Sequence, residues 1–290
     1  MILVVGATGL LGGMIIDRLV DNGRPVRALV RQTRNSASLE ARGVETVLGD
    51  LRDPASLDTA CQGVEIVIST ANSAARGGDD NPESVEERGN CNLVDAARRA
   101  NVRHFVFTSA LGSDLASPVP FLRGKAVAER CLKGSGLTYT ILMPNLFMEI
   151  WCPNIVGGPV LAGRPVTLLG EGKRKHSMIS MQDVASFAAA AAANERASNR
   201  VLVLGGPDPV SWLDVVATYE RLLGRPLEVR FVPMGEPLPG YPDFISGFMT
   251  ALETYDSVID TDSFAQEFGV HQVSLEESIR QQLTAVPSTS

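Results

Sequence analysis

Three glycines near the amino terminus have the spacing that holds a phosphate group against a peptide backbone. Gly6, Gly9 and Gly12 stand between the apolar run 2–5 and a segment with apolar residues at helical spacing. A pyrophosphate needs backbone N–H groups without a Cβ in the way, and the N-terminus of a helix supplies them with partial positive charge. A strand, a glycine turn and a helix in this order are typical of dinucleotide-binding domains. The residues predicted to bind the dinucleotide are Gly6, Thr8, Gly9, Leu10, Leu11 and Gly12.

The residues after the second apolar run indicate which dinucleotide is bound. An Asp or Glu at this place accepts hydrogen bonds from the ribose of NAD and repels the extra phosphate of NADP. This chain has Arg31-Gln32-Thr33-Arg34 instead. Because a guanidinium group suits a phosphate dianion, Arg31 and Arg34 predict NADP(H) as the cofactor. The alternative is that both arginines belong to a solvated surface.

The elements that must position these residues follow a regular alternation. Short apolar runs predict strands, and the segments between them have the apolar spacing of helices. Strands that alternate with helices form a parallel sheet covered on both faces. The predicted strands of this sheet are 2–5, 26–30, 46–48, 65–69, 104–108 and 138–142. The predicted helices include 38–42, 54–61, 82–100 and 122–133.

After Pro144 the alternation gives way to segments rich in glycine and proline. Strands are predicted at 166–169, 201–204 and 228–232, helices at 181–193, 213–223 and 275–283, and an irregular loop at 235–241. The predicted fold class is α/β, a Rossmann-type doubly wound parallel sheet with a smaller mixed α/β C-terminal substrate lobe. The expected domains are an NADP-binding domain at 1–150, a smaller substrate-binding lobe at 151–285 and a tail at 286–290.

Composition and charge exclude several other classes. The formal net charge of -7 argues against generic nucleic-acid binding. No apolar run reaches the roughly 20 residues that span a bilayer, which favours a soluble, cytoplasmic protein without a membrane span. No cluster of His, Asp or Glu indicates a metal site. Neither a zinc site nor a disulfide scaffold is suggested by Cys61, Cys91, Cys131 and Cys152.

Longer segments carry a family resemblance that covers most of the chain. They are GATGLLG at 6–12, LVR at 29–31, GDLRDPASL at 49–57, GNCNLVDAARRANVRHFVFTSA at 89–110, KAVAERCLKGSGLTYTILMPNLFME at 125–149, MQDVA at 181–185 and FGVHQVSLEESI at 268–279. In these segments the chain resembles the NmrA-like members of the atypical short-chain dehydrogenases/reductases. That group includes isoflavone-reductase-like and quinone-reductase-like proteins.

The resemblance implies further cofactor-binding residues. Asp50 and Leu51 would lie beside the adenine, although Asp50 has the alternative of capping the helix that begins at Pro54. After the fourth strand, the residues implied to line the cofactor are Ser69, Thr70 and Ala71. Near the nicotinamide end, the implied residues are Pro144, Asn145 and Phe147, the last of which has a place in the core as its alternative.

The catalytic segment departs from the family pattern. Related enzymes carry Tyr-x-x-x-Lys, in which the phenol transfers a proton and the lysine holds the nicotinamide ribose and lowers the tyrosine pKa. Here Phe121 stands in place of the tyrosine, four residues before Lys125, and a phenyl ring cannot transfer a proton. Lys125 is therefore the candidate acid or base, with a surface lysine as the alternative. Ser109 is the candidate hydroxyl for the substrate carbonyl, with Thr108 and Ser113 as rivals.

Together these features predict an NADPH-dependent oxidoreductase that passes a hydride to a small hydrophobic acceptor such as a quinone or an enone. If the reduced product is protonated by water, no side-chain acid is needed. The alternative is a non-catalytic NADP(H)-binding redox sensor or assembly factor, and a homodimer or another protein partner stays open. The candidate apolar walls of the substrate pocket are Phe147, Met148, Trp151, Met178, Phe244 and Phe248.

Overall fold

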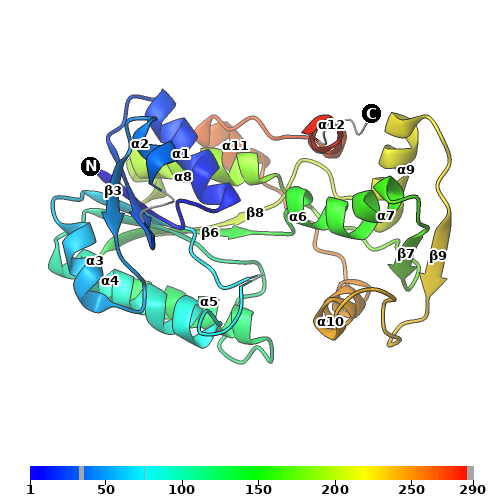
Figure 1. The fold of residues 1–290 in the computed structure, drawn as a ribbon, viewed down its shortest axis with the longest axis horizontal. Helices are drawn as coiled ribbons and strands as arrows, with labels where there is room; N and C mark the ends of the chain where they lie inside the picture. Colours follow the sequence, from blue (N-terminus) through cyan, green and yellow to red (C-terminus); the bar gives the residue numbers. More distant parts are fainter. Residues whose placement is uncertain (33–35, 75, 286–290) are drawn as a thin grey trace. The chain divides into compact units, whose positions relative to one another are not determined.

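The computed structural model describes residues 1–32, 36–74 and 76–285, and Figure 1 shows the course of the chain. The chain divides into two compact units. The first unit is Met1–Pro144, Val184–Val203 and Gln266–Val270, and the second is Asn145–Asp183, Leu204–Ala265 and His271–Ser290. Whereas the sequence analysis placed one boundary after residue 150, the chain here returns twice to the first unit. The expected tail at 286–290 lies outside the described residues.

A parallel sheet forms the centre of the first unit. Its strands are β1(Ile2–Val5), β2(Val26–Val30), β3(Glu45–Leu48), β4(Ile66–Ser69), β5(His104–Thr108), β6(Thr138–Pro144) and β8(Arg200–Leu204). Within the described residues they form one seven-stranded sheet in the order β3-β2-β1-β4-β5-β6-β8, and the pairs from β3 to β6 are parallel. This is the strand order of dinucleotide-binding domains, and it confirms the predicted Rossmann-type α/β class.

Helices cover both faces of this sheet, which is why β1, β4 and β5 are buried along their whole length. Figure 1 shows α3(Pro54–Cys61), α4(Asn90–Arg99) and α5(Pro120–Gly134) on one face. On the other face lie α1(Leu10–Asp21) and α8(Met181–Ala193), joined by a hydrogen bond from Arg18 Nε to Ser186 Oγ of 2.8 Å. The short α2(Ala37–Glu40) precedes β3.

The helix predicted at 82–100 has two parts. It begins as a π-helical segment, Glu83–Gly89, and continues as α4. A Cβ added at Gly89 would lie 2.9 Å from Leu51 Cβ, so the glycine allows the two segments to approach. The π-helical segment also carries Glu86 into the interior, where its exposed fraction is 0%.

The second unit has a small sheet of its own and a separate core. Its parallel strands are β7(Val166–Leu169) and β9(Val229–Val232), and its helical segments include α6(Met148–Cys152), a π-helical segment Pro153–Gly157, α7(Gly158–Leu161), α9(Trp212–Leu223), α10(Asp243–Leu252) and α12(Leu275–Ala285). A further helix, α11(Asp262–Phe268), contains the point where the chain passes from the second unit, which includes Ala265, to the first unit, which includes Gln266. The core gathers around Trp212, Tyr219 and Met178, which are at most 1% exposed.

The helices between 148 and 161, and those at 243–252 and 262–268, were missed in the sequence analysis. The prolines in the first of these regions suggested loops. However, Pro153 and Pro159 stand in the first turns of helical segments, where the missing N–H leaves no hydrogen bond unmade. The predicted strands at 166–169, 201–204 and 228–232 are confirmed to within one residue.

Across the described ranges, no helix combines the length and the hydropathy needed to cross a bilayer.

Candidate active site

The glycine loop has the geometry that a phosphate group requires. Gly6 adopts a φ of 85°, a conformation that residues with a Cβ rarely take. A Cβ added at Gly12 would stand 2.2 Å from the carbonyl oxygen of Gly6, so α1 can begin this close to the loop because residue 12 is a glycine. Among the described side chains none caps the amino end of α1, which begins after Gly9. Thr8, Gly9 and Leu10 are exposed, so the loop presents its backbone to solvent.

The end of β4 lies directly against this loop. Thr70 N donates to the carbonyl of Val5 at 2.9 Å, and a Cβ added at Gly6 would lie 2.5 Å from Thr70 Oγ1. Ser69 differs from the expectation, because its hydroxyl is fully buried and donates to Asn90 Oδ1 at 2.9 Å. Of the three residues implied here, Thr70 and Ala71 therefore adjoin the loop, while the Ser69 side chain packs inside the unit.

Lys125 is a buried ammonium held at the carboxyl ends of two strands. Its side chain comes from α5, the residue is 2% exposed, and the alternative of a surface lysine is wrong. Lys125 Nζ donates to the carbonyls of Ala71 at 3.2 Å and Thr108 at 3.0 Å. Burial lowers the pKa of Lys125 to about 8, against the opposing influence of the Glu86 and Glu129 carboxylates. Thr70, which adjoins Gly6, and Ala71, which accepts from Lys125, thus connect the glycine loop to Lys125 after the end of β4.

Two carboxylates that the sequence analysis did not single out accompany the ammonium. Glu129 is 6% exposed, and its Oε1 accepts from Ser109 Oγ at 2.5 Å and from Ser113 Oγ at 2.6 Å. Glu86 accepts from Ser73 N at 2.6 Å through Oε1, while its buried Oε2 has no hydrogen-bond partner among the described residues. The spacing of four between Lys125 and Glu129 places both on one helical face, which was the signal available in the sequence.

The Glu129 contacts limit what Ser109 can do. A carboxylate accepts hydrogen bonds and donates none, so the Ser109 hydroxyl directs its proton toward Glu129. Ser109 can then offer a lone pair to a ligand, but its proton is committed. The predicted role of steadying a substrate carbonyl requires this proton to be released from Glu129.

The expected NADP-selecting arginine lies in a cluster of charges. Arg31 Nη1 pairs with Asp80 Oδ2 at 2.6 Å, and Arg52 pairs with Asp50 at 2.7 Å. Hydrogen bonding from Arg52 lowers the pKa of Asp50. The suggestion that Asp50 caps α3 is wrong, since Asp53 is the capping residue and accepts from Ala55 N. Arg34 lies outside the described residues.

The residues implied for the nicotinamide end fall on both sides of the boundary between the units. Pro144 ends the first unit, and its carbonyl accepts from Leu111 N at 3.0 Å. Asn145 and Phe147 belong to the second unit, where Asn145 Nδ2 donates to Ser257 Oγ at 3.0 Å. Phe147 is half-buried and immediately precedes α6.

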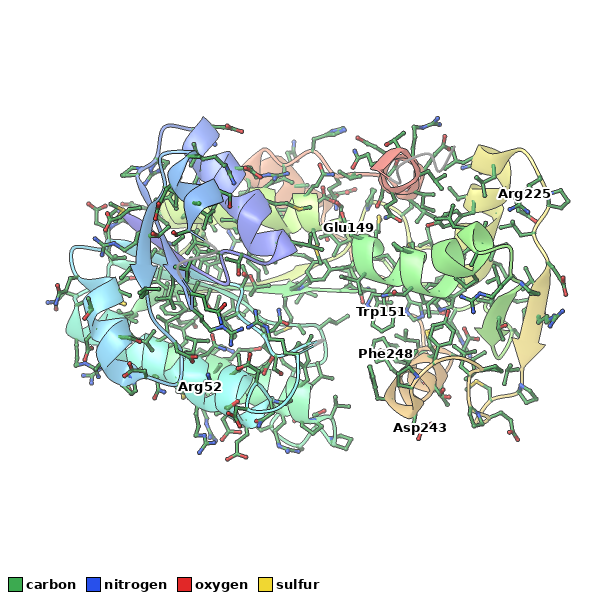
Figure 2. All side chains as sticks on the ribbon, in the orientation of Figure 1. Arg52, Glu149, Trp151, Arg225, Asp243 and Phe248 are labelled. Atoms are coloured by element: carbon green, nitrogen blue, oxygen red, sulfur yellow. A yellow bond between two sulfur atoms is a disulfide. The ribbon has the colours of Figure 1, made fainter. Side chains whose placement is uncertain are left out.

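The candidate pocket walls divide into core and surface residues. Met148 and Met178 are 1% and 0% exposed and belong to the core of the second unit, so the prediction that they line a pocket is wrong. Trp151 and Phe248, both labelled in Figure 2, stack with their ring centroids 4.6 Å apart, and Phe244 is 73% exposed. The second unit therefore presents aromatic side chains at its surface.

Comparison with known proteins identifies the family. The model of the NmrA-like family matches residues 1–286. The chain belongs to the NmrA-like family. It is 35% identical over 239 residues to a photosystem II assembly factor of Cyanophora paradoxa, covering 80% of this chain and 72% of the relative. It is 32% identical over 237 residues to an NAD(P)H azoreductase of Xenophilus azovorans, covering 80% and 76%.

The fold of this NmrA-like protein also matches a solved structure. The NADPH-dependent quinone oxidoreductase of Escherichia coli, solved with NADPH, superimposes with a TM-score of 0.78 at 22% identity. The match covers 98% of this chain and 100% of the other. It supports the two-part architecture described above.

Phe121, four residues before Lys125 on α5, contacts the lysine of this NmrA-like chain. The Lys125 ammonium lies 5.6 Å from the centroid of the Phe121 ring and 5.0 Å from that of Phe107. Both distances are typical of cation–π contacts, which stabilise the charged lysine without moving a proton. Phe121 can therefore cover and orient Lys125, and proton transfer must use other groups.

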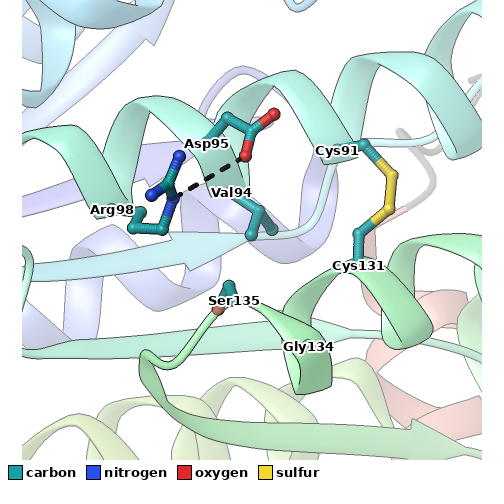
Figure 3. Close-up of a pocket in the computed structure, with 7 residues that line it drawn as sticks. All are labelled: Cys91, Val94, Asp95, Arg98, Cys131, Gly134 and Ser135. Carbon is teal, nitrogen blue, oxygen red and sulfur yellow. Dashed lines mark ion pairs between the residues drawn. A yellow bond between two sulfur atoms is a disulfide. The ribbon is translucent and has the colours of Figure 1, made fainter.

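The cysteines of this NmrA-like chain differ from the expectation. Cys91 of α4 and Cys131 of α5 form a disulfide with Cα atoms 5.7 Å apart, although the sequence analysis expected no disulfide. The spacing of 40 residues concealed the pair, which the packing of α4 on α5 brings together. The disulfide lines a hollow of about 340 Å³ together with Arg98 and Ser135, and Figure 3 shows these residues. Neither the glycine loop nor Lys125 lines this hollow.

Among the described residues no group of three His, Cys, Asp or Glu side chains is arranged to hold a metal ion.

Proposed function

We propose that this chain is an NADPH-dependent reductase that transfers a hydride to a small, hydrophobic, conjugated acceptor such as a quinone. The observation that carries the proposal is the line of groups from the glycine loop to Lys125. Gly6 adjoins Thr70, the neighbouring Ala71 carbonyl accepts from Lys125, and Lys125 also contacts the end of β5. A dinucleotide laid across the carboxyl ends of a Rossmann sheet follows this course.

The residues of the first unit fit the parts of NADP(H) one by one. The backbone of the glycine loop and the uncapped end of α1 would hold the pyrophosphate. Arg31 would hold the 2′-phosphate, and Asp50 with Leu51 would lie at the adenine. Lys125 would hold the hydroxyls of the nicotinamide ribose, because its ammonium is placed between two strand ends. When bound, the dihydronicotinamide supplies the hydride.

Lys125 is also suited to supply a proton to the reaction. With a pKa of about 8 it carries its proton at neutral pH, yet releases it far more readily than an ordinary lysine. Hydride addition to a quinone leaves an oxyanion, which takes up one proton to give the hydroquinone. Either the Lys125 ammonium or water can supply this proton, so the reaction does not require the tyrosine that Phe121 replaces.

The second unit supports the choice of an aromatic acceptor. Trp151 and Phe248 form a stacked pair, and Phe244 is largely exposed. Aromatic faces bind flat rings and offer no partners for the hydroxyls of a sugar. The similarity to an NAD(P)H azoreductase supports the same class, since an azo compound is also a conjugated acceptor.

The test is turnover of NADPH with a panel of quinones, enones and azo dyes. We expect loss of NADPH absorbance with at least one acceptor, in equal amount to the reduced product. Trp151→Ala should raise the KM for that acceptor while leaving the dissociation constant of NADPH unchanged. Phe231, an aromatic residue that is 54% exposed on β9, offers a matched control variant, Phe231→Ala. No turnover with any member of the panel would contradict the proposal.

A second function is favoured by one specific observation. A relative with 35% identity is a photosystem II assembly factor, and Phe121 removes the usual proton donor. This chain could accordingly bind NADP(H) and act through a protein partner. Tight NADPH binding without turnover across the whole panel would favour this function over the reductase.

A further inference from the structure

Three arginines from separate segments converge on the carboxylate of Asp80. Arg31 Nη1 lies 2.6 Å and Arg76 Nη1 lies 3.4 Å from Asp80 Oδ2, while Arg52 Nη1 lies 3.7 Å from Oδ1. The Asp80 side chain is 13% exposed, whereas each of the three arginine side chains is at least 37% exposed. Asp80 is thus enclosed by guanidinium groups that still reach solvent.

This arrangement conflicts with the expected use of Arg31. Arg31 follows β2, at the place where a Rossmann domain selects between NAD and NADP. If Arg31 binds a 2′-phosphate, that dianion and the Asp80 carboxylate must share one guanidinium group. Two single negative charges about 4 Å apart repel each other by about 1 kcal/mol in water. The repulsion is stronger where solvent is partly excluded.

We propose that Asp80 is an internal competitor of the 2′-phosphate of NADP(H), and that Arg52 and Arg76 join Arg31 in binding this phosphate when the Asp80 carboxylate turns aside. This inference rests on the proposed function, because it concerns the cofactor of that reductase. It assigns to Asp80 control over the preference for NADPH over NADH.

The partners of the arginines support this assignment. Arg52 is held independently of Asp80, since its Nε and Nη2 donate to the two oxygens of Asp50 at 3.0 and 2.7 Å. It therefore keeps its place when Asp80 moves. In contrast, the ion pairs that Arg31 and Arg76 form in the described part of the chain are both with the Asp80 carboxylate. Moving Asp80 leaves both free to bind another anion.

The charge of the cluster fits a phosphate dianion. Three guanidinium groups face the Asp50 and Asp80 carboxylates, and the exposed Asp79 carboxylate also interacts electrostatically with Arg52. Without the Asp80 carboxylate the cluster gains one net positive charge, which favours binding of a phosphate with two negative charges at neutral pH. The tetrahedral oxygens of a phosphate can also accept from several guanidinium groups at once.

The backbone around Asp80 has room for the movement. Gly77 and Gly78 precede it by three and two residues, and a Cβ added at either would meet nothing within 4 Å. Gly78 has a φ of 63°. The loop is tied at its far side, where Ser84 Oγ donates to the carbonyl of Asp79 at 2.6 Å. Rotation of the Asp80 side chain thus suffices, and the loop need not be displaced as a whole.

NADH responds differently to the same carboxylate. Its ribose carries a 2′-hydroxyl, which can donate a hydrogen bond to Asp80. Asp80 therefore favours NADH slightly and opposes NADPH, so it reduces the discrimination that the arginines would provide by themselves.

The test measures binding of two fragments, 2′,5′-ADP and 5′-AMP, which differ by the 2′-phosphate. We expect Asp80→Asn to tighten 2′,5′-ADP binding about tenfold and to change 5′-AMP binding less than about twofold. Arg76→Gln should weaken 2′,5′-ADP about fivefold with little effect on 5′-AMP. Asp79→Asn is the matched control, because Asp79 is the exposed neighbour with the same charge. Asp80→Ser is a second variant, and thermal unfolding shows that each variant folds.

The outcomes separate this inference from the proposed function. If the two Asp80 variants bind 2′,5′-ADP no more tightly than Asp79→Asn does, while the wild type binds NADPH, the inference is overturned and the proposed function stands. Unchanged 2′,5′-ADP binding by Arg76→Gln would also overturn it. If the wild type binds neither NADPH nor 2′,5′-ADP, the proposed function fails and the inference fails with it.

Discussion

The Lys125 end and the Arg31 end of the first unit both bring cations against carboxylates, but they do so in different surroundings. Lys125, Glu86 and Glu129 are at most 6% exposed, whereas Arg31 and its neighbouring arginines reach solvent. Burial penalises charge, so it lowers the pKa of Lys125 to about 8 and prepares that residue for proton transfer. The exposed arginines keep their charge and can exchange one anion for another. The difference teaches that burial makes a cation give up its proton more readily, whereas exposure leaves a cation able to exchange its partners.

The largest expected effect tests the buried end. Lys125→Met keeps a long apolar side chain but removes the ammonium, and we expect kcat/KM to fall about 100- to 1000-fold. The matched control is Lys173→Met, because Lys173 is an exposed lysine of the second unit. Steady-state rates with NADPH and the best acceptor provide the measurement. A loss of less than about threefold would indicate that water protonates the product and that Lys125 only positions the cofactor.

The next effect concerns the stability of the first unit, in which the disulfide joins α4 to α5. Reducing Cys91–Cys131, or replacing both cysteines by serine, should lower the free energy of unfolding by about 2–4 kcal/mol for a loop of this length. Chemical denaturation with and without dithiothreitol measures the change. The double variant is its own control, since dithiothreitol should not destabilise it further. Binding of 2′,5′-ADP at the exposed end should stay the same, and a parallel loss there would break the contrast between the two ends.

The smallest effect distinguishes the two ends by pH. The Lys125 ammonium is the acid, and it is lost as the pH rises through its pKa of about 8. We therefore expect kcat/KM to be constant below that pH and to fall by up to about tenfold per pH unit above it. Affinity for 2′,5′-ADP should stay level from about pH 7 to 9, because arginines remain charged and the phosphate is already a dianion. If kcat/KM rises above pH 8, Lys125 acts as a base instead.

Local signals predicted much of this protein. The strands of the central sheet, the glycine loop and Lys125 each follow from residues that are near one another in the sequence. Glycine at positions 6 and 12 is required by a positive φ and by a close backbone approach, which depend on short-range geometry. The helices at 148–161 were missed because Pro153 has a permitted place in a first helical turn that a general rule about proline does not reveal.

Other features depended on residues that are distant in the sequence. Asp80 contacts Arg31 across 49 residues, and Cys91 meets Cys131 across 40. Neither pair has a sequence motif, since any other aspartate or cysteine would look the same in the sequence. Met148 and Met178 likewise could have lined a pocket or filled the core, and packing placed both in the core.

The sequence by itself determined that a strand, a glycine turn and a helix open this protein and that Phe121 stands four residues before Lys125. These properties belong to short segments, whose backbone preferences and side-chain chemistry act locally. Only the tertiary structure decided that Lys125 is buried beside two carboxylates and that Asp80 occupies the arginines expected to bind a phosphate. Burial and ion pairing depend on which segments pack together, and this sheet brings the ends of β2, β4 and β5 to the same edge.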